Sequence, residues 1–480
     1  MKRLLTILCF IAVFGCTNRT EAPAILFGGE MHNSNASTPE SIDASMDIAA
    51  ALGYNAVLAP VSWAQTEIEP GVFDFSLVDH LLKTAGERNL YLGLLWFGTW
   101  KNGESSYPPV WVRQNSFYAV APDGTVATAI SPFCSYALEA DKAAFSALTG
   151  HLKRADKEHR VLCIQIENEC GAFIERDCCP EALKAWQDGD DPQRFMAEAF
   201  AKYVDQVAAA GKEVYDIPMF TNAWLKAADA PYGKYPNGGP RECVLDVWKE
   251  HAPHLDWLSP DIYDPGFARI SNAYAQGQPL FIPETKNDGG RIWYALGEAG
   301  AKGVFSFGYE EKFNNPYYVQ ECRVISEMMP LICKGYPMRA FYREPKVDPA
   351  DAVFSLPLGN FTFEIHCIDG EKNAHGIIVQ TATDEYIIAG VGAWISVSGQ
   401  IASCEEIRNG KVWQVLNGDE TAHHNMLYLR GRLYLEEFTA PDGTIIPAPM
   451  YGLSYQRRFR KAEQERFKIS GIYRIKLYSK

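Results

Sequence analysis

The sequence predicts a (β/α)₈ barrel followed by a smaller, all-β domain. Short apolar runs alternate with helical patterns about eight times over roughly 290 residues, which is the size and rhythm of such a barrel. The runs are continuously apolar, as are the strands of a parallel sheet that helices cover on its outer face. After about residue 340 the helical patterns stop, and short β-type runs separated by turn residues take over.

The expected elements of the barrel follow one another regularly. Thr38 and Pro39 suit the cap and the first turn of the first helix. A doubly wound open sheet is the alternative, but its first strand usually precedes a G-x-G-x-x-G loop, which Gly28-Gly29-Glu30 does not match. The expected strands are 24–32, 54–63, 91–100, 161–171, 217–224, 257–263, 279–284 and 303–309, and the expected helices are 38–52, 75–89, 141–157, 192–210, 244–252, 269–275 and 291–299.

The composition divides the chain into three parts: a leader and tether at 1–22, the catalytic (TIM) barrel at 23–340 and a β-sandwich domain at 341–480. In the leader, Lys2 and Arg3 precede the apolar run 4–14, and the Cys16 that follows resembles a bacterial lipobox. We expect an exported protein, anchored as a lipoprotein in the periplasm or at the outer membrane or cell surface. An ordinary signal peptide with an incidental cysteine is the alternative.

Charge and cysteine usage exclude several classes of function. A formal net charge of -14 repels the phosphates of nucleic acid. The 12 cysteines include no C-x-x-C pair, and the adjacent Cys178 and Cys179 are poorly spaced for zinc. We therefore predict no metal site, no cofactor, no nucleic-acid partner and no membrane contact beyond the lipid anchor. The sequence gives neither the disulfide pairing nor the oligomeric state.

Carboxylates at the ends of two strands indicate the chemistry, because active sites of these barrels lie at the carboxyl ends of the strands. Glu169 ends the fourth strand in I-E-N-E, and Glu284 ends the seventh in I-P-E-T, so they face one another across the barrel mouth. Retaining glycoside hydrolysis uses two carboxyl groups about 5 Å apart. Some of the further strand-end residues could be structural rather than bind substrate. The candidates are Asn168, Tyr263, Glu30, His32, Trp63, Trp96, Asn222, Trp224 and Tyr309. Lys101, Asn102 and Asp261 also end strands but are not among these candidates.

The residues around both carboxylates resemble the family 35 glycoside hydrolases, which are β-galactosidases within the superfamily of retaining (β/α)₈ glycosidases. The segment 165–171, Q-I-E-N-E-C-G, is similar to that family's Q-I-E-N-E-Y-G. The segments 67–75 and 28–32 are similar to its E-P-x-x-G-x-F-D-F and G-G-x-x-H motifs. The resemblance covers residues 24–340 and suits a bacterial subgroup with a short C-terminal β domain. It implies Glu169 as general acid/base, Glu284 as nucleophile, Asn168 as partner of the sugar 2-hydroxyl and Tyr263 as the residue that orients the nucleophile.

Two departures from the family bear on the substrate. Cys170 stands where tyrosine is usual, and the segment 96–102 lacks the family's glycine/proline-and-glutamate segment, which helps to select galactose. We expect an exo-acting, retaining β-galactosidase that acts on oligo- or polysaccharides, with Glu167 as a structural residue paired with a base. The alternatives are another β-glycosidase or an endo-glycanase of the same superfamily, and a non-catalytic carbohydrate-binding lipoprotein.

Overall fold

The computed structural model describes residues 22–33, 36–227, 229–313, 315–368 and 374–408, and then the shorter stretches 411–415, 422–423, 425–429, 432–433, 438–439, 445–446 and 468–479. The predicted leader with its lipobox cysteine lies in residues 1–21, outside this description. Among the described residues, no helix combines the length and the apolar character that crossing a bilayer requires.

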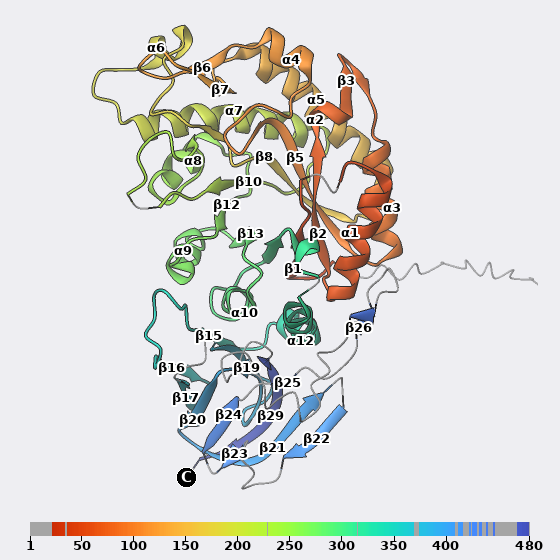
Figure 1. Ribbon diagram of the computed structural model, residues 1–480, viewed down its shortest axis with the longest axis vertical. Coiled ribbons are helices and arrows are strands. Elements are labelled where there is room, and N and C mark those ends of the chain that lie inside the picture. The colour runs from red at the N-terminus through yellow and green to blue at the C-terminus, as the bar shows by residue number, and fades with distance from the viewer. Residues whose placement is uncertain are drawn as a thin grey trace, which may run out of the picture.

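Eight parallel strands close into a barrel, which confirms the predicted fold class (Figure 1). Around the barrel the order is β1-β14-β13-β12-β10-β8-β5-β2, so that each strand lies beside its neighbour in the chain. The strands are β1 (Leu26–Glu30), β2 (Ala56–Ser62), β5 (Tyr91–Lys101), β8 (Val161–Asn168), β10 (Met219–Trp224), β12 (Trp257–Ile262), β13 (Phe281–Thr285) and β14 (Gly303–Phe307).

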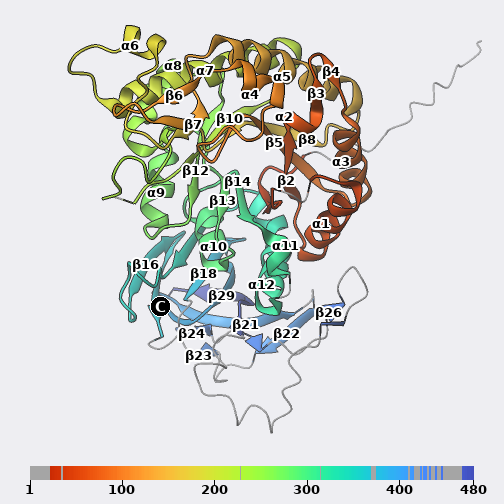
Figure 2. The ribbon, with the colours of Figure 1, turned by 45° about the horizontal axis from the view of Figure 1, so that its top comes forward.

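Helices cover the outside of the barrel, and Figure 2 shows two of them, α10 and α12, between the barrel and the C-terminal sheets. The Thr38 hydroxyl caps α1 by accepting a hydrogen bond from the backbone N–H of Ser41. The sequence patterns do not predict α12, and α5 begins six residues before the predicted helix. The main helices are α1 (Pro39–Leu52), α3 (Ser76–Glu87), α5 (Ser135–Ala155), α7 (Pro192–Val214), α8 (Leu245–His251), α9 (Phe267–Tyr274), α10 (Gly289–Gly297) and α12 (Pro316–Cys333).

Short elements decorate the connections between strands and helices. The hairpin β3-β4 follows the second barrel strand, and β6-β7 follows the third. The short elements are α2 (Trp63–Thr66), α4 (Val110–Asn115), α6 (Pro180–Ala185), α11 (Tyr309–Lys312), η1 (Glu242–Val244), β3 (Glu67–Glu69), β4 (Val72–Phe73), β6 (Tyr118–Val120), β7 (Val126–Ile130), β9 (Gly171–Ala172) and β11 (Asn237–Gly238).

The interior of the barrel is filled, so a ligand can bind only at its mouth. Buried side chains from the barrel strands form a cluster separate from the main core between strands and helices. Phe97, Phe220, Phe281 and Phe305 are its largest fully or nearly buried members. Polar side chains replace these apolar ones toward the carboxyl ends of the strands.

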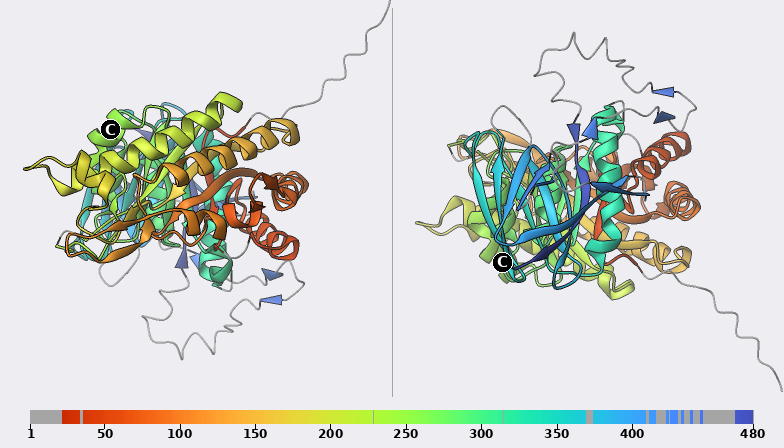
Figure 3. Two further views of the ribbon diagram at one scale, coloured as in Figure 1. Left: turned by 90° about the horizontal axis from the view of Figure 1, so that it is seen from above. Right: turned by 90° about the horizontal axis from the view of Figure 1, so that it is seen from below.

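Two antiparallel sheets follow the barrel, which confirms the predicted all-β domain. A buried apolar cluster that draws on both sheets forms its core. In the view from below in Figure 3 the cyan and blue strands of these sheets lie in front of the barrel. One sheet is β15 (Met338–Tyr342), β18 (His375–Gln380), β19 (Glu385–Val391), β29 (Gly471–Tyr478), β21 (Gln400–Arg408) and β22 (Lys411–Val415); the other is β16 (Val353–Leu358), β17 (Phe361–Cys367), β20 (Ala393–Val397), β24 (Met426–Leu429) and β23 (Ala422–His423). Two further pairs are β25 (Arg432–Leu433) with β28 (Lys468–Ile469) and β26 (Phe438–Thr439) with β27 (Ile445–Ile446).

A buried carboxylate on α12 joins the barrel to this domain. Glu321 accepts hydrogen bonds from Trp293 Nε1 at 2.8 Å, from the Ser470 backbone N–H at 2.9 Å and from the Ser470 hydroxyl at 2.7 Å. It also lies 3.2 Å from His375 Nε2. Burial opposes ionisation, yet the contacts with His375 and Ser470 lower the pKa of Glu321 to about 2. Residues from α10, α12, β18 and the start of β29 therefore meet at one acceptor.

Candidate active site

The end of β8 departs from regular strand geometry. Glu167 and Glu169 have φ angles of 61° and 49°, in the left-handed region that residues other than glycine seldom adopt. Such conformations persist only where the surrounding structure holds them, and they gather at functional sites. As a result the side chains do not alternate, because Glu167 turns toward α5 while Glu169 turns into the barrel mouth.

The structure corrects the expectation that Glu167 pairs with a base. Its carboxylate accepts the backbone N–H groups of Thr99 at 3.1 Å and Trp100 at 2.6 Å. Its charged neighbour is another acid, Asp141, which is also fully buried and accepts hydrogen bonds from Trp96 Nε1 and the Thr99 hydroxyl. Burial, followed by the proximity of Asp141, raises the pKa of Glu167 well above its ordinary value.

Replacing Asp141 should flatten the dependence of stability on pH. The raised pKa of Glu167 means that the folded protein keeps a proton which the unfolded chain releases above about pH 4 to 5. Stability should therefore fall as pH rises from there toward the folded-state pKa. In Asp141→Asn the amide can donate to Glu167, so the loss of Tm between pH 5 and pH 9 should be smaller than in the wild type. The exposed Asp188→Asn serves as control, and parallel Tm curves for all three proteins would contradict the prediction.

A pocket of about 360 Å³ opens at the carboxyl ends of the strands, within the size range of small-molecule sites. Three buried carboxyl groups line it, and one oxygen from each lies within 4.8 Å of the others. These are Glu169, Asp261 and Glu284, from β8, β12 and β13. Lys101, Asn102, Tyr263 and Trp224 complete the wall around them.

Glu169 is held in place by two amide side chains. Asn102 Nδ2 donates to Glu169 Oε2 at 2.8 Å, and the backbone N–H of Glu169 donates to Asn222 Oδ1 at 2.8 Å. Burial and the neighbouring Glu284 carboxylate raise the pKa of Glu169 to about 8, although Lys101 opposes the shift. This carboxyl group therefore carries a proton at neutral pH, as a general acid must.

Glu284 has surroundings that favour its ionised form relative to Glu169. The Tyr263 hydroxyl donates to Glu284 Oε2 at 2.6 Å. Burial raises the pKa of Glu284, while the Lys101 ammonium and this hydrogen bond lower it. Glu284 Oε1 has no hydrogen-bond partner in the described part of the chain. One oxygen is thus fixed and the other is left to react.

Two further acids lie against this pair. Burial, then Glu284 and Glu169, raises the pKa of Asp261 well above its usual value. Burial and Glu284 likewise raise the pKa of Glu30, and neither of its buried carboxyl oxygens has a partner among the described residues. The carboxylates of Glu169, Asp261 and Glu284 have the spacing of a cation site. The Lys101 ammonium lowers the pKa values of Glu30, Glu169 and Glu284. Lys101 therefore supplies positive charge to this group of acids.

Removing the charge of Lys101 should move the pH profile of turnover to higher pH. Lys101→Met deprives Glu284 and Glu169 of a nearby cation, so both pKa values should rise. The acidic limb, which reports ionisation of Glu284, and the basic limb, which reports loss of the Glu169 proton, should both shift upward. At pH 5 we expect a loss of kcat/KM on the order of tenfold. Lys101→Arg keeps the charge and should keep the profile, whereas an unshifted profile in Lys101→Met would contradict the role.

Two asparagines connect the strand ends beneath the pocket. Asn222 Nδ2 donates to Asp261 Oδ2 at 2.8 Å and to Asn168 Oδ1 at 3.1 Å. Asn168 Oδ1 also accepts from Gln165 Nε2, while its own Nδ2 is buried without a partner among the described residues. Asn222 therefore acts as a connector, and Asn168 retains a donor for a ligand.

The remaining predicted residues divide between the mouth and the core. Trp224 lines the pocket, is 37% exposed and meets the Phe173 ring edge-on at 5.8 Å. His32 lines an adjoining pocket, where its ring lies 5.8 Å from that of Phe307. Glu30 ends β1 and is fully buried.

Three predicted aromatic residues lie in the core, which corrects their assignment to the substrate site. Trp63, Trp96 and Tyr309 are fully buried, and each uses its polar atom within the protein. Trp63 Nε1 donates to Glu67, Trp96 Nε1 to Asp141 and the Tyr309 hydroxyl to the Ser45 carbonyl. Trp96 lies on β5, whereas Trp63 and Tyr309 begin the short helices α2 and α11, and all three side chains are buried in the protein rather than at the mouth.

The prediction omitted three residues that the structure brings into the pocket. Lys101, Asn102 and Asp261 all end barrel strands, but no motif singled them out. Asp261 could have been found by strand periodicity, because it stands two residues before Tyr263. Asn102 could not, since its φ of 55° places it beyond the regular strand.

Comparison with known proteins agrees with this geometry. Residues 19–220 match the family model described as Glycosyl hydrolases family 35. The first part of the barrel is therefore similar to this family. This match confirms the resemblance seen in the sequence motifs and indicates a glycoside hydrolase. The matched range includes Glu169 but ends before the strand that carries Glu284. No curated protein sequence matches the chain.

Solved structures share the fold. A β-galactosidase from Rahnella sp. R3 superposes with a TM-score of 0.50 at 16% identity, covering 67% of this chain and 58% of the Rahnella chain. A catalytic mutant of a GH42 β-galactosidase from G. stearothermophilus gives a TM-score of 0.50 at 15% identity, with coverages of 65% and 57%. The chain thus spans less than two thirds of either protein, and at this identity the likeness concerns the fold.

Proposed function

We propose that the protein is a retaining β-glycoside hydrolase that releases terminal galactose from β-galactosides in oligo- or polysaccharides. The observation that carries the proposal is the spacing of Glu169 and Glu284, whose nearest oxygens lie within 4.8 Å across the mouth of the barrel. Retaining enzymes need about 5 to 5.5 Å between the two carboxyl groups, whereas inverting enzymes need about 6.5 to 9.5 Å to admit a water molecule.

The surroundings of the two groups suit opposite roles in a double displacement. Glu169, protonated at neutral pH, donates its proton to the leaving oxygen as Glu284 Oε1 attacks the anomeric carbon. The resulting Glu169 carboxylate then takes a proton from water, which releases the sugar from Glu284. Tyr263 and Asn102 keep the two carboxyl groups oriented through their hydrogen bonds.

One polar atom of a pocket-lining residue and one on an asparagine beneath the pocket are available to bind sugar hydroxyl groups. Asn168 Nδ2 is a donor and Asp261 Oδ1 can bind a hydroxyl, and both are buried without partners among the described residues. Buried polar atoms of this kind destabilise a protein unless a ligand or water satisfies them. Trp224 offers an exposed ring face of the kind that packs against a sugar.

The test is a panel of nitrophenyl β-galactoside, β-glucoside, β-xyloside and α-arabinoside, with the anomer of the first product followed by NMR. We expect the β-galactoside to give the highest kcat/KM and the product to keep its configuration. An inverted product would refute the retaining mechanism, and preference for another glycoside would assign a different sugar to the same chemistry. Absence of turnover throughout would favour a non-catalytic carbohydrate-binding protein. Lipid anchoring at Cys16 stays a prediction from the sequence.

A further inference from the structure

A second pocket of about 360 Å³ adjoins the catalytic pocket. Asn33 lines both of them, and its buried Oδ1 has no partner among the described residues. Phe97 lines the second pocket, and the Lys101 ammonium, which lines the first, lies 4.8 Å from the centre of its ring. The two pockets therefore adjoin at Asn33.

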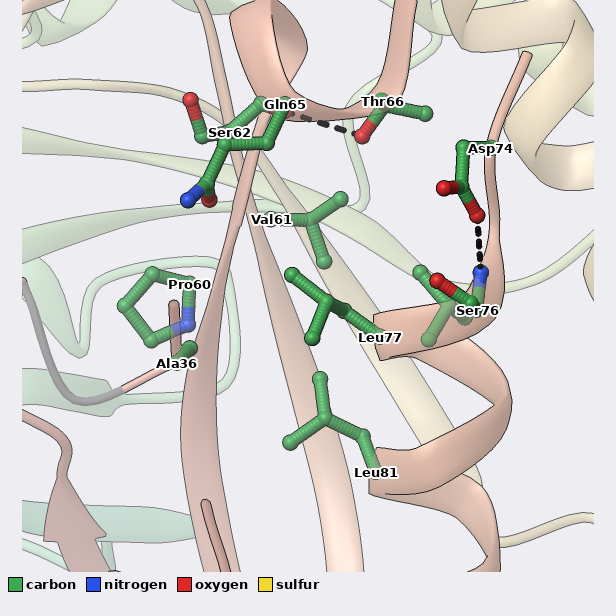
Figure 4. A pocket seen from close by; sticks show the side chains of 11 residues that line it. Ala36, Pro60, Val61, Ser62, Gln65, Thr66, Asp74, Ser76, Leu77 and Leu81 are labelled. Atoms are coloured by element: carbon green, nitrogen blue, oxygen red, sulfur yellow. Dashed lines mark hydrogen bonds between the residues drawn. The ribbon is translucent and has the colours of Figure 1, made fainter. Parts of the chain in front are cut away.

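The second pocket offers hydrogen-bonding groups that the protein itself does not use. Ser62, Gln65, Ser106 and Tyr107 line it, and within the described part of the chain none of these side chains has a hydrogen-bond partner. Gln65 also lines a smaller neighbouring pocket against α3, together with Leu77 and Leu81 (Figure 4). Tyr107 is fixed by its edge-on contact with Phe97 at 5.1 Å, which leaves its hydroxyl available.

The charge of the second pocket differs from that of the first. The catalytic pocket is lined by Lys101 and four acidic residues, whereas no aspartate, glutamate, lysine or arginine lines the second pocket. Hydroxyl and amide groups beside the Phe97 and Tyr107 rings suit a neutral ligand rich in hydroxyl groups, because they exchange hydrogen bonds without a charge to neutralise.

We infer that this second pocket is a subsite for a further neutral sugar unit, joined to the sugar that is cleaved in the catalytic pocket. The inference rests on the proposed function and deepens it, since it makes an extended glycan the preferred substrate. A further unit within the leaving group agrees with the release of terminal galactose, whereas a further unit on the cleaved sugar would mean that a disaccharide is released. Both cases use the same contacts with Gln65 and Tyr107.

The test compares the wild type with the double variant Gln65→Ala, Tyr107→Phe on three substrates. Nitrophenyl β-galactoside has no second sugar unit. In nitrophenyl β-digalactoside the added unit belongs to the cleaved sugar or to the leaving group, depending on which bond breaks, and a β-galactosyl trisaccharide adds units to the leaving group. The double variant loses two hydrogen bonds to the further sugar unit, so its kcat/KM should fall about tenfold for one of the extended substrates. The nitrophenyl β-galactoside should stay within about twofold of the wild type. The exposed Tyr478→Phe on β29 serves as control.

Unchanged or equally reduced kcat/KM values for all three substrates would overturn the subsite. Products of the extended substrates tell the two attachments apart, since free digalactose from nitrophenyl β-digalactoside requires the added unit on the cleaved sugar. If the wild type hydrolyses no substrate, the proposed function fails, and calorimetric titration with galactose and the trisaccharide then tests the pocket by itself. Weaker binding of the trisaccharide alone in the double variant supports the subsite, and equal binding overturns it.

Discussion

Glu284→Gln should lower kcat by about 10⁴-fold or more while leaving the fold intact. The amide cannot attack the anomeric carbon, so the covalent route closes. Gln is nearly isosteric and can still accept the hydrogen bond that Tyr263 donates, so little packing changes. The measurement is turnover of nitrophenyl β-galactoside, or of the best glycoside in the panel, together with the Tm of the variant. Normal turnover would refute the assignment of the nucleophile.

Glu169→Gln is the matched variant, because both residues are buried in the same pocket and both lose one ionisable group. A general acid contributes roughly 10²- to 10⁴-fold, and most where the leaving group is basic. We expect a large loss with an unactivated disaccharide and a smaller one with nitrophenol as leaving group. Glu284→Gln should lose activity with both substrates alike. The same dependence on the leaving group in both variants would contradict the separate roles.

Glu321→Gln should have the largest effect on stability and lower the free energy of unfolding by about 3 to 5 kcal/mol. Removing one partner of a buried charged network leaves the other buried groups unpaired. One amide oxygen would replace two carboxylate oxygens that face donors from Trp293 and Ser470 and the ring of His375. Thermal and urea unfolding followed by circular dichroism would measure the loss. Glu327→Gln, an exposed change of the same kind on the same helix, is the control and should leave the Tm near that of the wild type.

The pH dependence of this difference provides an independent check. The pKa of Glu321 is lowered in the folded protein, so its stabilising contribution is present above the unfolded value near pH 4 to 5 and disappears as pH falls toward 2. The gap between wild type and Glu321→Gln should therefore shrink over that interval. A gap of constant size down to pH 2 would mean that the carboxylate charge contributes nothing at this position.

The barrel and its two principal carboxylates could be predicted because both depend on local patterns. Continuous apolar strands separated by amphipathic helices specify the fold, and Glu169 and Glu284 stand where such strands must end. The orientation of Glu167 could not be predicted, since alternation assumes regular strand geometry and its φ of 61° is imposed by the tertiary structure. Trp63 and Trp96 show the same limit, because being near a strand end does not determine which face a side chain takes.

The contribution of Lys101 was also beyond the sequence patterns, and strand periodicity could indicate the position of Asp261 but not its effect on the other acids. Each is an ordinary charged residue at a strand end, and its effect arises only when β8, β12 and β13 bring carboxyl oxygens within 4.8 Å of one another. The contact of Glu321 on α12 with Ser470 joins segments 149 residues apart. Patterns of a few residues carry no information about pairings at such separations.

The position of β29 in its sheet affects the order in which the chain folds during synthesis. This strand lies between β19 and β21, yet it follows both of them in the chain by more than 60 residues. The barrel through α12 can be complete while the sheet still lacks its middle strand, so β19 and β21 present open edges that can pair with other chains. The six-stranded sheet should thus form late, because β29 becomes available only when the end of the chain has been made. Nascent chains stopped before residue 471 would expose those edges and be the most prone to aggregate.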